Sequence, residues 1–182
     1  MRRLRYGVAM SLDGFIAGPN GEYDWIIPDP VIDFAAIHAQ FDTLLMGRRT
    51  YEVARTRRAQ FEGFGQKWIV VSRTLKADEC KGVHLLSGEV EQAVAALKAE
   101  PGKDIWLMGG GVLFRSLLDA GLVDGIDPMV MPVMLGSGTP LLPEGRRRWL
   151  KLEKSQALDS GILILNYSVA QDVAAQPGSP SW

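Results

Sequence analysis

Three short segments of this chain carry residue types that bind phosphate, and each follows an apolar stretch. They are Gly47-Arg48-Arg49-Thr50, Ser72-Arg73-Thr74 and Gly109-Gly110-Gly111. Glycines at a turn from a strand into a helix let main-chain N–H groups approach an anion, and the helix N-terminus adds partial positive charge. A guanidinium flanked by hydroxyls matches a phosphate dianion through paired hydrogen bonds. The sequence therefore predicts phosphate contacts at three places.

The triple glycine, taken alone, suits a tight turn as well as it suits a phosphate site. It does not follow the Walker pattern, which needs Lys and then Ser or Thr after its last glycine. Rossmann spacing would need glycine where Phe114 stands. A motif becomes informative only in its structural context, so the surrounding elements decide between the two interpretations.

Apolar periodicity predicts alternating strands and helices over most of the chain. Strands are expected at residues 4–10, 43–46, 67–71, 83–86 and 104–108, and helices at 29–42, from 47 onward, at 90–99 and at 111–121. Asp29 is the expected N-cap of the first helix, with Pro30 at its first position. After Gly121 only strands are expected, at 126–133, 150–158 and 162–170, the last two joined by a hairpin.

This order of elements predicts an α/β fold with a mixed, mostly parallel sheet and an antiparallel C-terminal edge. In such sheets ligands bind at the carboxyl ends of the strands, so the three segments would converge on one extended ligand. The triple glycine would hold a pyrophosphate, and a second helix that begins at Gly47 to Thr50 would have its N-terminus beside it. Ser72 to Thr74 would hold a separate, terminal phosphate. Two phosphate groups far apart describe NADPH.

Length and composition suit one domain over residues 1–172 and a loose tail over 173–182. The chain has 182 residues, of which 47% are hydrophobic and 23% charged. Its net charge of −1, without a basic face, argues against nucleic acid as a partner. There is no apolar run of about 18 residues, no signal-peptide core, and only one cysteine, Cys80. We therefore expect a cytoplasmic protein with no membrane partner and no metal site.

Five segments, in this order, resemble the dihydrofolate reductase-like superfamily, in particular the stand-alone relatives of the reductase domain of riboflavin biosynthesis. They are Val8–Ala17, Leu45–Glu52, Val71–Thr74, Trp106–Leu113 and Pro132–Leu141. The resemblance implies a three-layer α/β/α fold with a mixed sheet of about eight strands. It also implies an NADPH site and hydride transfer to a small, heterocyclic substrate. Many relatives are homodimers, so a homodimer is implied too.

The resemblance assigns individual residues to the cofactor. It places two sets around the cofactor's phosphates: Gly47, Arg48, Arg49 and Thr50, and Gly109, Gly110, Gly111, Val112 and Leu113. It places Ser72, Arg73 and Thr74 at the adenosine 2′-phosphate. Ala9 and Ile16 would line the nicotinamide.

For catalysis, the protein must orient the cofactor against the substrate and supply a proton. In dihydrofolate reductases an acid on the first helix binds the substrate, and the resemblance makes Asp33 the match. Asp33 equally suits a first-turn aspartate favoured by the helix dipole. Trp25 is a candidate cover of the substrate pocket and Tyr51 a candidate substrate contact, and both also suit packing.

Two departures from the relatives bear on the substrate. Residues 18–21 read Gly-Pro-Asn-Gly where the dihydrofolate reductase lid carries Pro-Trp, which argues against folate. Residues 51–58 lack the Asp-Asp-Pro run of the riboflavin enzymes, so no ribose-phosphate site is predicted. The expected function is an NADPH-dependent reductase of unassigned substrate. The alternative is a non-catalytic NADPH-binding protein.

Overall fold

The computed structural model describes residues 1–61 and 63–170. Its strands are β1 (Leu4–Ser11), β2 (Phe15–Ala17), β3 (Phe41–Gly47), β4 (Lys67–Val71), β5 (His84–Leu86), β6 (Asp104–Gly109), β7 (Gly125–Met131), β8 (Thr139–Pro140), β9 (Leu150–Ala157) and β10 (Leu163–Val169). Its helices are α1 (Phe34–His38), α2 (Arg48–Thr56), α3 (Val90–Ala99) and α4 (Gly111–Asp119), with short 3₁₀ turns at Arg58–Gln60 and Ala77–Glu79.

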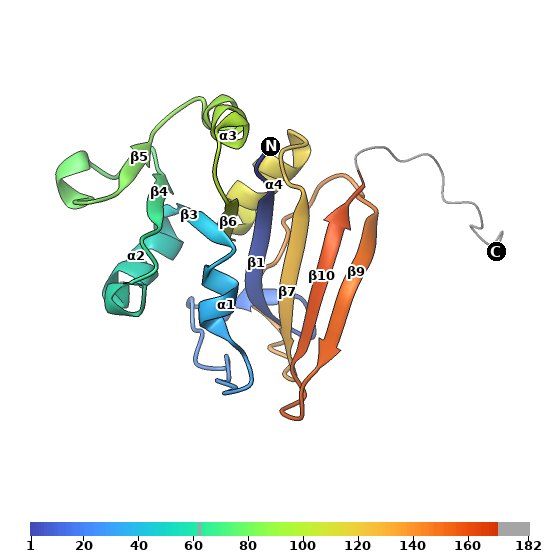
Figure 1. Cartoon of the computed structure of the whole chain (residues 1–182). Helices are drawn as coiled ribbons and strands as arrows, with labels where there is room; N and C mark the ends of the chain where they lie inside the picture. Colours follow the sequence, from blue (N-terminus) through green and yellow to red (C-terminus); the bar gives the residue numbers. More distant parts are fainter. Residues whose placement is uncertain (62, 171–182) are drawn as a thin grey trace.

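Eight of the strands in this described part form one sheet, in the order β5-β4-β3-β6-β1-β7-β10-β9 (Figure 1). Each neighbouring pair of strands from β5 through to β7 in this order is parallel. β10 is antiparallel to both β7 and β9. The predicted mixed sheet, mostly parallel with an antiparallel C-terminal edge, is confirmed.

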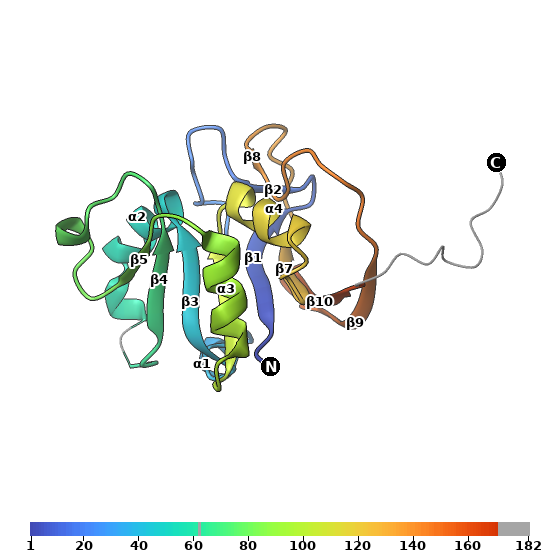
Figure 2. The same ribbon diagram turned by 90° about the horizontal axis from the view of Figure 1, so that it is seen from above.

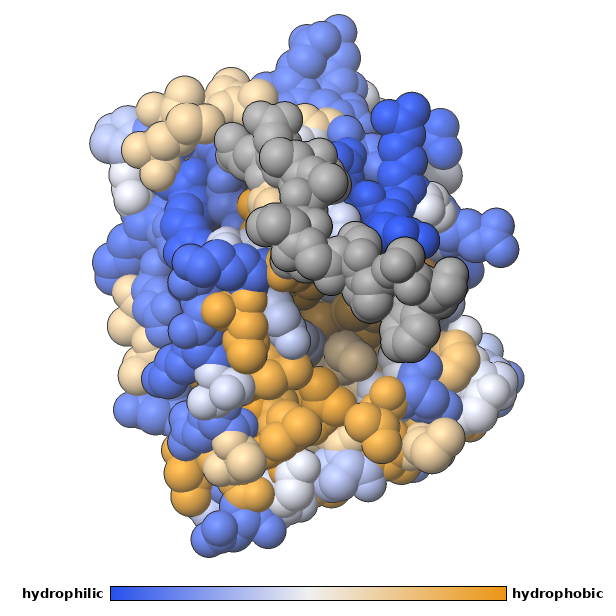
Figure 3. Space-filling model, turned by 90° about the vertical axis from the view of Figure 1, so that its right-hand side faces the viewer, coloured by the Kyte–Doolittle hydropathy of each residue, from blue (hydrophilic) through white to orange (hydrophobic). Residues whose placement is uncertain are grey.

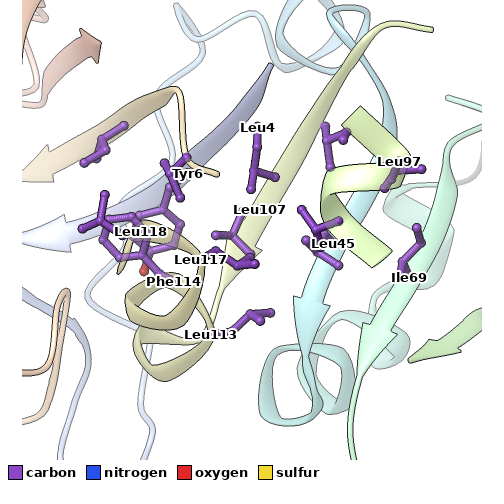
Figure 4. Close-up of a cluster of buried hydrophobic side chains, with 14 residues drawn as sticks. Leu4, Tyr6, Leu45, Ile69, Leu97, Leu107, Leu113, Phe114, Leu117 and Leu118 are labelled. Carbon is purple, nitrogen blue, oxygen red and sulfur yellow. The ribbon is translucent and has the colours of Figure 1, made fainter. Parts of the chain in front are cut away.

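One face of the sheet is covered by α3 and α4, which lie over the strands in Figure 2. Here Leu113, Phe114 and Leu117 of α4 pack against Tyr6 and Leu107 of the sheet (Figure 4). The rings of Tyr6 and Phe114 stack with their centroids 3.9 Å apart. Because these apolar side chains recur at helical and strand spacing, their burial fixes α4 against β1 and β6.

The opposite face carries α1, α2 and the segment before α1. Tyr51 and Ala54 of α2 pack on Leu44, Met46 and Val70 of the sheet. A third cluster joins Ile32 to Met131 and Ile162, with Ile37 of α1 beside it. Helices thus lie on both faces, which is the three-layer arrangement that the sequence predicts.

The first helix is shorter than predicted, and its predicted start at Asp29 is wrong. α1 spans only Phe34–His38, with Asp33 as its N-cap. The Asp29 carboxylate instead accepts hydrogen bonds from the Ser160 hydroxyl, at 2.5 Å, and from the main chain of Val31. Because Asp29 is tied to the distant hairpin and Ile32 is drawn into the third cluster, the chain enters the helix four residues later.

The short ribbon of β2 and β8 was not predicted. These strands of three and two residues pair outside the main sheet. Elements this short carry too little periodicity to be recognised in the sequence. The helix at Val90–Ala99, the strand at Lys67–Val71 and the hairpin between β9 and β10 are confirmed. No helix in residues 1–61 and 63–170 is long and apolar enough to cross a membrane. The predicted tail, 173–182, lies outside the described residues.

Candidate active site

The three predicted phosphate-binding segments follow three neighbouring parallel strands. β3 ends at Gly47, β4 is followed by Ser72, and β6 ends at Gly109. In the sheet β3 lies between β4 and β6, and Gly47 pairs with Val71 while Met46 pairs with Gly109. The carboxyl ends of all three strands therefore lie together at one edge, as the sequence predicts for residues that share a ligand.

The N-termini of α2 and α4 meet at this edge. Gly47 is the N-cap of α2 and Gly110 the N-cap of α4, and within the described structure neither helix receives a side-chain capping bond. A Cβ added to Gly110 would lie 3.9 Å from both the Cα and the main-chain N of Gly47. Two first turns with free main-chain N–H groups thus face one place, a suitable arrangement for a pyrophosphate. We call Gly47 and Gly109–Gly111 the glycine cradle.

The glycine cradle depends on the absence of side chains. Gly109 and Gly110 have φ angles of +156° and +95°, and a Cβ on Gly109 would lie 3.0 Å from the Thr50 hydroxyl. Val112 is 79% exposed, while Leu113 is buried in the core, so Leu113 has only its main chain to offer a ligand. The structure therefore contains the backbone approach that a bound phosphate requires.

Arg48 links the start of α2 to the segment after β4. Its Nη1 donates to the Thr74 hydroxyl at 2.8 Å, and its Nε donates to Glu52 at 2.7 Å. The hydrogen bond to Glu52 raises the pKa of Arg48. Ser72 Oγ accepts from the main chains of Thr74 and Leu75 and so holds this turn. Arg49 and Arg73 are exposed nearby in the chain. A guanidinium and two hydroxyls are thus gathered at the predicted site of the second phosphate.

Asp13 fixes the turn between β1 and β2, beside the predicted nicotinamide residues Ala9 and Ile16. Its carboxylate accepts from the Ser11 hydroxyl at 2.6 Å and from the main chain of Gly136 at 2.7 Å. These hydrogen bonds, the one from Ser11 foremost, lower the pKa of Asp13 to about 2. The segment after β7 is thereby held against the segment after β1.

A cavity of about 420 Å³ lies on the α1 side of the sheet, and we call it the α1-side cavity. Its apolar lining includes Ile32, Ile37, Phe41, Trp106, Met129 and Ile164. Its polar lining includes Arg5, Asp33, Asp127, Lys154, Gln156 and Asn166. It follows the face of β1 that Ala9 shares, because Gly7 and Ala9 are two residues apart on one strand. Polar and apolar residues line this cavity in similar numbers, which suits a small organic ligand that has both kinds of surface.

The polar floor of the α1-side cavity is a hydrogen-bonded row across three strands. Arg5 Nε donates to Asp127 Oδ2 at 2.8 Å, and Asn166 Nδ2 donates to Asp127 Oδ1 at 2.8 Å. The Arg5 and Asp127 side chains are each 15% exposed. Because the two charges neutralise each other and Asn166 satisfies the second carboxylate oxygen, this row is a stable floor rather than a free charged group.

Gly7 lets the Trp106 indole cross β1 and form one wall of the cavity. Trp106 Nε1 donates to the Gly7 carbonyl at 2.9 Å. A Cβ on Gly7 would lie only 2.6 Å from that nitrogen. Any side chain at position 7 would therefore displace the indole.

Comparison with known proteins identifies the family. A family model described as the RibD C-terminal domain matches residues 2–164. The chain belongs to this family. It is 34% identical over 178 residues to YyaP of Bacillus subtilis (strain 168), covering 91% of this chain and 94% of that one.

Solved structures agree with this assignment. A putative riboflavin biosynthesis protein from Shewanella sp. PV-4 superposes with a TM-score of 0.77 at 27% identity, covering 92% of this chain and 99% of that one. A dihydrofolate reductase from Enterococcus faecalis, complexed with NADP(H) and RAB-propyl, superposes with a TM-score of 0.67 at 19% identity, covering 92% and 96%. At that identity the second match shows the shared fold alone. The resemblance inferred from the sequence is thus confirmed for family and fold.

In this member of the RibD C-terminal domain family, the predicted substrate residues Asp33, Trp25 and Tyr51 lie in three different environments. Asp33 lines the α1-side cavity, and its Oδ1 accepts from the main chain of Ala36 at 2.9 Å as the cap of α1. Trp25 packs beside the cluster around Ile32, and its indole donates to the Glu22 carbonyl. Trp25 therefore adjoins the cavity without lining it.

Tyr51 does not line the cavity, contrary to the prediction. It is 3% exposed and packs edge-on against Trp68 in the core under α2. Burial raises the pKa of its hydroxyl. The prediction relied on nearness to Thr50 in the sequence, but on a helix adjacent residues point about 100° apart. Thr50 faces Gly109, while Tyr51 faces the sheet.

The polar residues on β7, β9 and β10 were missed by the sequence analysis. Asp127 lies two residues from Met129, and Asn166 two residues from Ile164. That alternation was a usable signal, since it puts one polar residue on an otherwise apolar face. Only the strand order shows that this face is the one beside Ala9.

Proposed function

We propose that this protein is an NADPH-dependent reductase that transfers a hydride to a small, ring-containing substrate in the α1-side cavity. The observation that carries this proposal is that the N-termini of α2 and α4 meet at Gly47 and Gly110. At the neighbouring strand end, Arg48 donates a hydrogen bond to the Thr74 hydroxyl. Two anion sites at neighbouring strand ends suit a cofactor that carries a pyrophosphate and a second phosphate.

Family membership supports the same proposal. A structural neighbour is a dihydrofolate reductase complexed with NADP(H), and its fold matches this chain over 92% of the length. The glycine cradle would hold the pyrophosphate, and Ser72, Arg73 and Thr74, with Arg48, would hold the 2′-phosphate. Ala9 and Ile16 would then lie against the nicotinamide, next to the cavity that Ala9 borders.

When bound, NADPH would supply a hydride to the carbon of a C=N or C=O bond in the substrate, and the nitrogen or oxygen of that bond would need a proton from the protein or from water. Asp33 and Asp127 both line the cavity, and Asp127 is already paired with Arg5. One oxygen of Asp33 accepts from Ala36, and the other has no hydrogen-bond partner in residues 1–61 and 63–170. Asp33 is therefore placed to bind a donor edge of the substrate and to pass on a proton.

Titration of the purified protein with NADPH and NADH, by calorimetry, tests the cofactor. We expect NADPH to bind more tightly than NADH. No binding of NADPH would end the proposal. Oxidation of NADPH across a panel of imines, pterins and carbonyl compounds tests catalysis, and tight binding without turnover would favour the non-catalytic alternative.

The variant Asp33→Asn separates the two roles of Asp33. Asparagine caps a helix about as well as aspartate does, so α1 should keep its stability. Loss of a general acid typically lowers kcat by a factor of about 100 or more. If Asp33→Asn and wild type had equal kcat on an active panel compound, Asp33 would be a helix cap alone.

A further inference from the structure

The floor of the α1-side cavity changes from apolar to polar along the strands. Ala9 pairs with Met129, and Met129 pairs with Ile164, at the carboxyl end of β1. Two residues nearer the start of β1, Gly7 pairs with Asp127, and on the neighbouring strands Asn166 pairs with Lys154. Figure 3 shows that hydrophobic residues gather in the lower half of the side of the molecule where β9 lies. A ligand with one apolar and one polar end would have a defined orientation here.

Lys154 is the cavity's unpaired cation. Arg5 is neutralised by Asp127. The acid next to Lys154 in the chain, Glu153, is bonded to Lys151 and to Ser168. Among residues 1–61 and 63–170, Lys154 forms no salt bridge, and the side-chain amide of Gln156 forms no hydrogen bond. The far wall of the cavity thus presents one ammonium and one amide to a ligand.

Ala9 on β1 and Lys154 on β9 are too far apart for a single ring to contact both. From β1 to β9 there are three strand spacings, which is about 14 Å at about 4.8 Å each. The cavity volume of about 420 Å³ also falls in the range of pockets that hold molecules larger than one ring. An occupant that touches both Ala9 and Lys154 must therefore be elongated.

We propose that the substrate is an elongated molecule whose reducible ring lies beside Ala9 and Met129 and whose carboxylate is bound by Lys154 and Gln156. The placement of the reducible ring rests on the proposed reductase function, whereas the binding of the carboxylate does not. A carboxylate fits this wall better than a phosphate does. Phosphate dianions are bound by guanidinium forks and helix N-termini, and in the described structure the residues of β9 and β10 at this wall provide neither.

A matched pair of probes tests the carboxylate. Calorimetry would compare 6-phenylhexanoate with its uncharged carboxamide at low ionic strength. We expect wild type to bind the acid about fivefold more tightly, the scale of one solvent-accessible ion pair. Lys154→Met should remove this preference. The control Lys151→Met should keep it, because the Lys151 side chain is 77% exposed and already paired with Glu153.

Three outcomes would overturn the carboxylate assignment. They are an equal affinity of wild type for acid and amide, a preference that survives Lys154→Met, and a preference lost equally in Lys151→Met. A third probe, 5-phenylpentyl phosphate, would also overturn it by binding more than tenfold tighter than the acid. NADPH titration of the same samples keeps the two proposals apart. If the protein did not bind NADPH but still preferred the acid to the amide, only the proposed reductase function would be refuted.

Discussion

The glycine cradle and the α1-side cavity lie on the same sheet but are built in different ways. The cradle is made of main-chain groups at two turns, and each turn lies within a few residues of the chain. The cavity is made of side chains that meet from distant positions: Arg5 and Asp127 are 122 residues apart, and Asp127 and Asn166 are 39 apart. The first region depends on backbone shape, whereas the second depends on which side chains the strand order brings together.

This difference explains how relatives can share a fold and bind different molecules. A cradle of main-chain N–H groups needs glycine at a few places and tolerates change elsewhere. The lining of a cavity can change residue by residue without altering the sheet. Proteins that share this fold at low sequence identity can therefore keep one region and change the other.

The strongest test of the cradle is Gly110→Ala. With φ at +95°, alanine is strained at this position, and its methyl group would stand where a phosphate approaches. We expect NADPH affinity to fall about 100-fold, or about 2.7 kcal/mol, by calorimetry. The control is Gly121→Ala at the other end of α4, with φ at +69° and open space around it. If both variants lost the same amount of NADPH affinity, backbone strain alone would explain the loss, and the cradle would not be the site that binds phosphate.

A smaller effect is expected for Arg73→Ala. Charge-assisted hydrogen bonds are worth about 1.5–3 kcal/mol, so the variant should lose about tenfold or more in NADPH affinity and little in NADH affinity. NADH lacks the 2′-phosphate, which makes it the internal control. Equal losses for both cofactors, measured by fluorescence titration, would remove Arg73 from this site.

The cavity side is tested by Gly7→Ala. A methyl group 2.6 Å from the Trp106 indole nitrogen must displace the ring, and overpacking of this kind costs about 1–3 kcal/mol. Urea denaturation should show this loss, while NADPH affinity stays within about twofold because the cradle is untouched. Gly88→Ala is the control, since a Cβ there meets nothing within 4 Å. A Gly7→Ala protein as stable as wild type would contradict the tight Gly7–Trp106 contact.

The smallest effect concerns His38, whose ring stacks on Phe64 and lies 5.0 Å from that of Trp106 behind the cavity. Burial lowers the pKa of His38 below its usual 6.5. As the pH falls, the unfolded chain therefore takes up a proton on His38 at a higher pH than the folded protein does. The free energy of unfolding keeps the full contribution of His38 above about pH 6.5 and decreases as the pH drops toward the pKa of His38 in the folded protein. The melting temperature should decrease between pH 7.5 and 5.5. His38→Phe should flatten this decrease, and His84→Gln, at an exposed position, should leave it unchanged.

Sequence reasoning was most successful where a pattern is local. The helix at Val90–Ala99 and the strand at Lys67–Val71 have the predicted bounds, since their apolar spacing and flanking breakers lie within the elements themselves. The same reasoning placed the first helix wrongly, because Asp29 is held by Ser160, 131 residues away. It left Tyr51 open between a substrate contact and core packing, since proximity in the chain does not show which side of α2 faces the core.

The sequence by itself determined the alternation of strands and helices, the phosphate-binding residue types at three strand ends and hence the family, because each of these depends on short-range chemistry along the chain. Only the tertiary structure decided that the α2 and α4 N-termini meet, that Gly7 makes room for Trp106, and that Lys154 lines the same cavity as Gly7 and Met129. These facts depend on the order of strands in the sheet. That order comes from burying apolar faces across the whole chain, and no single segment encodes it.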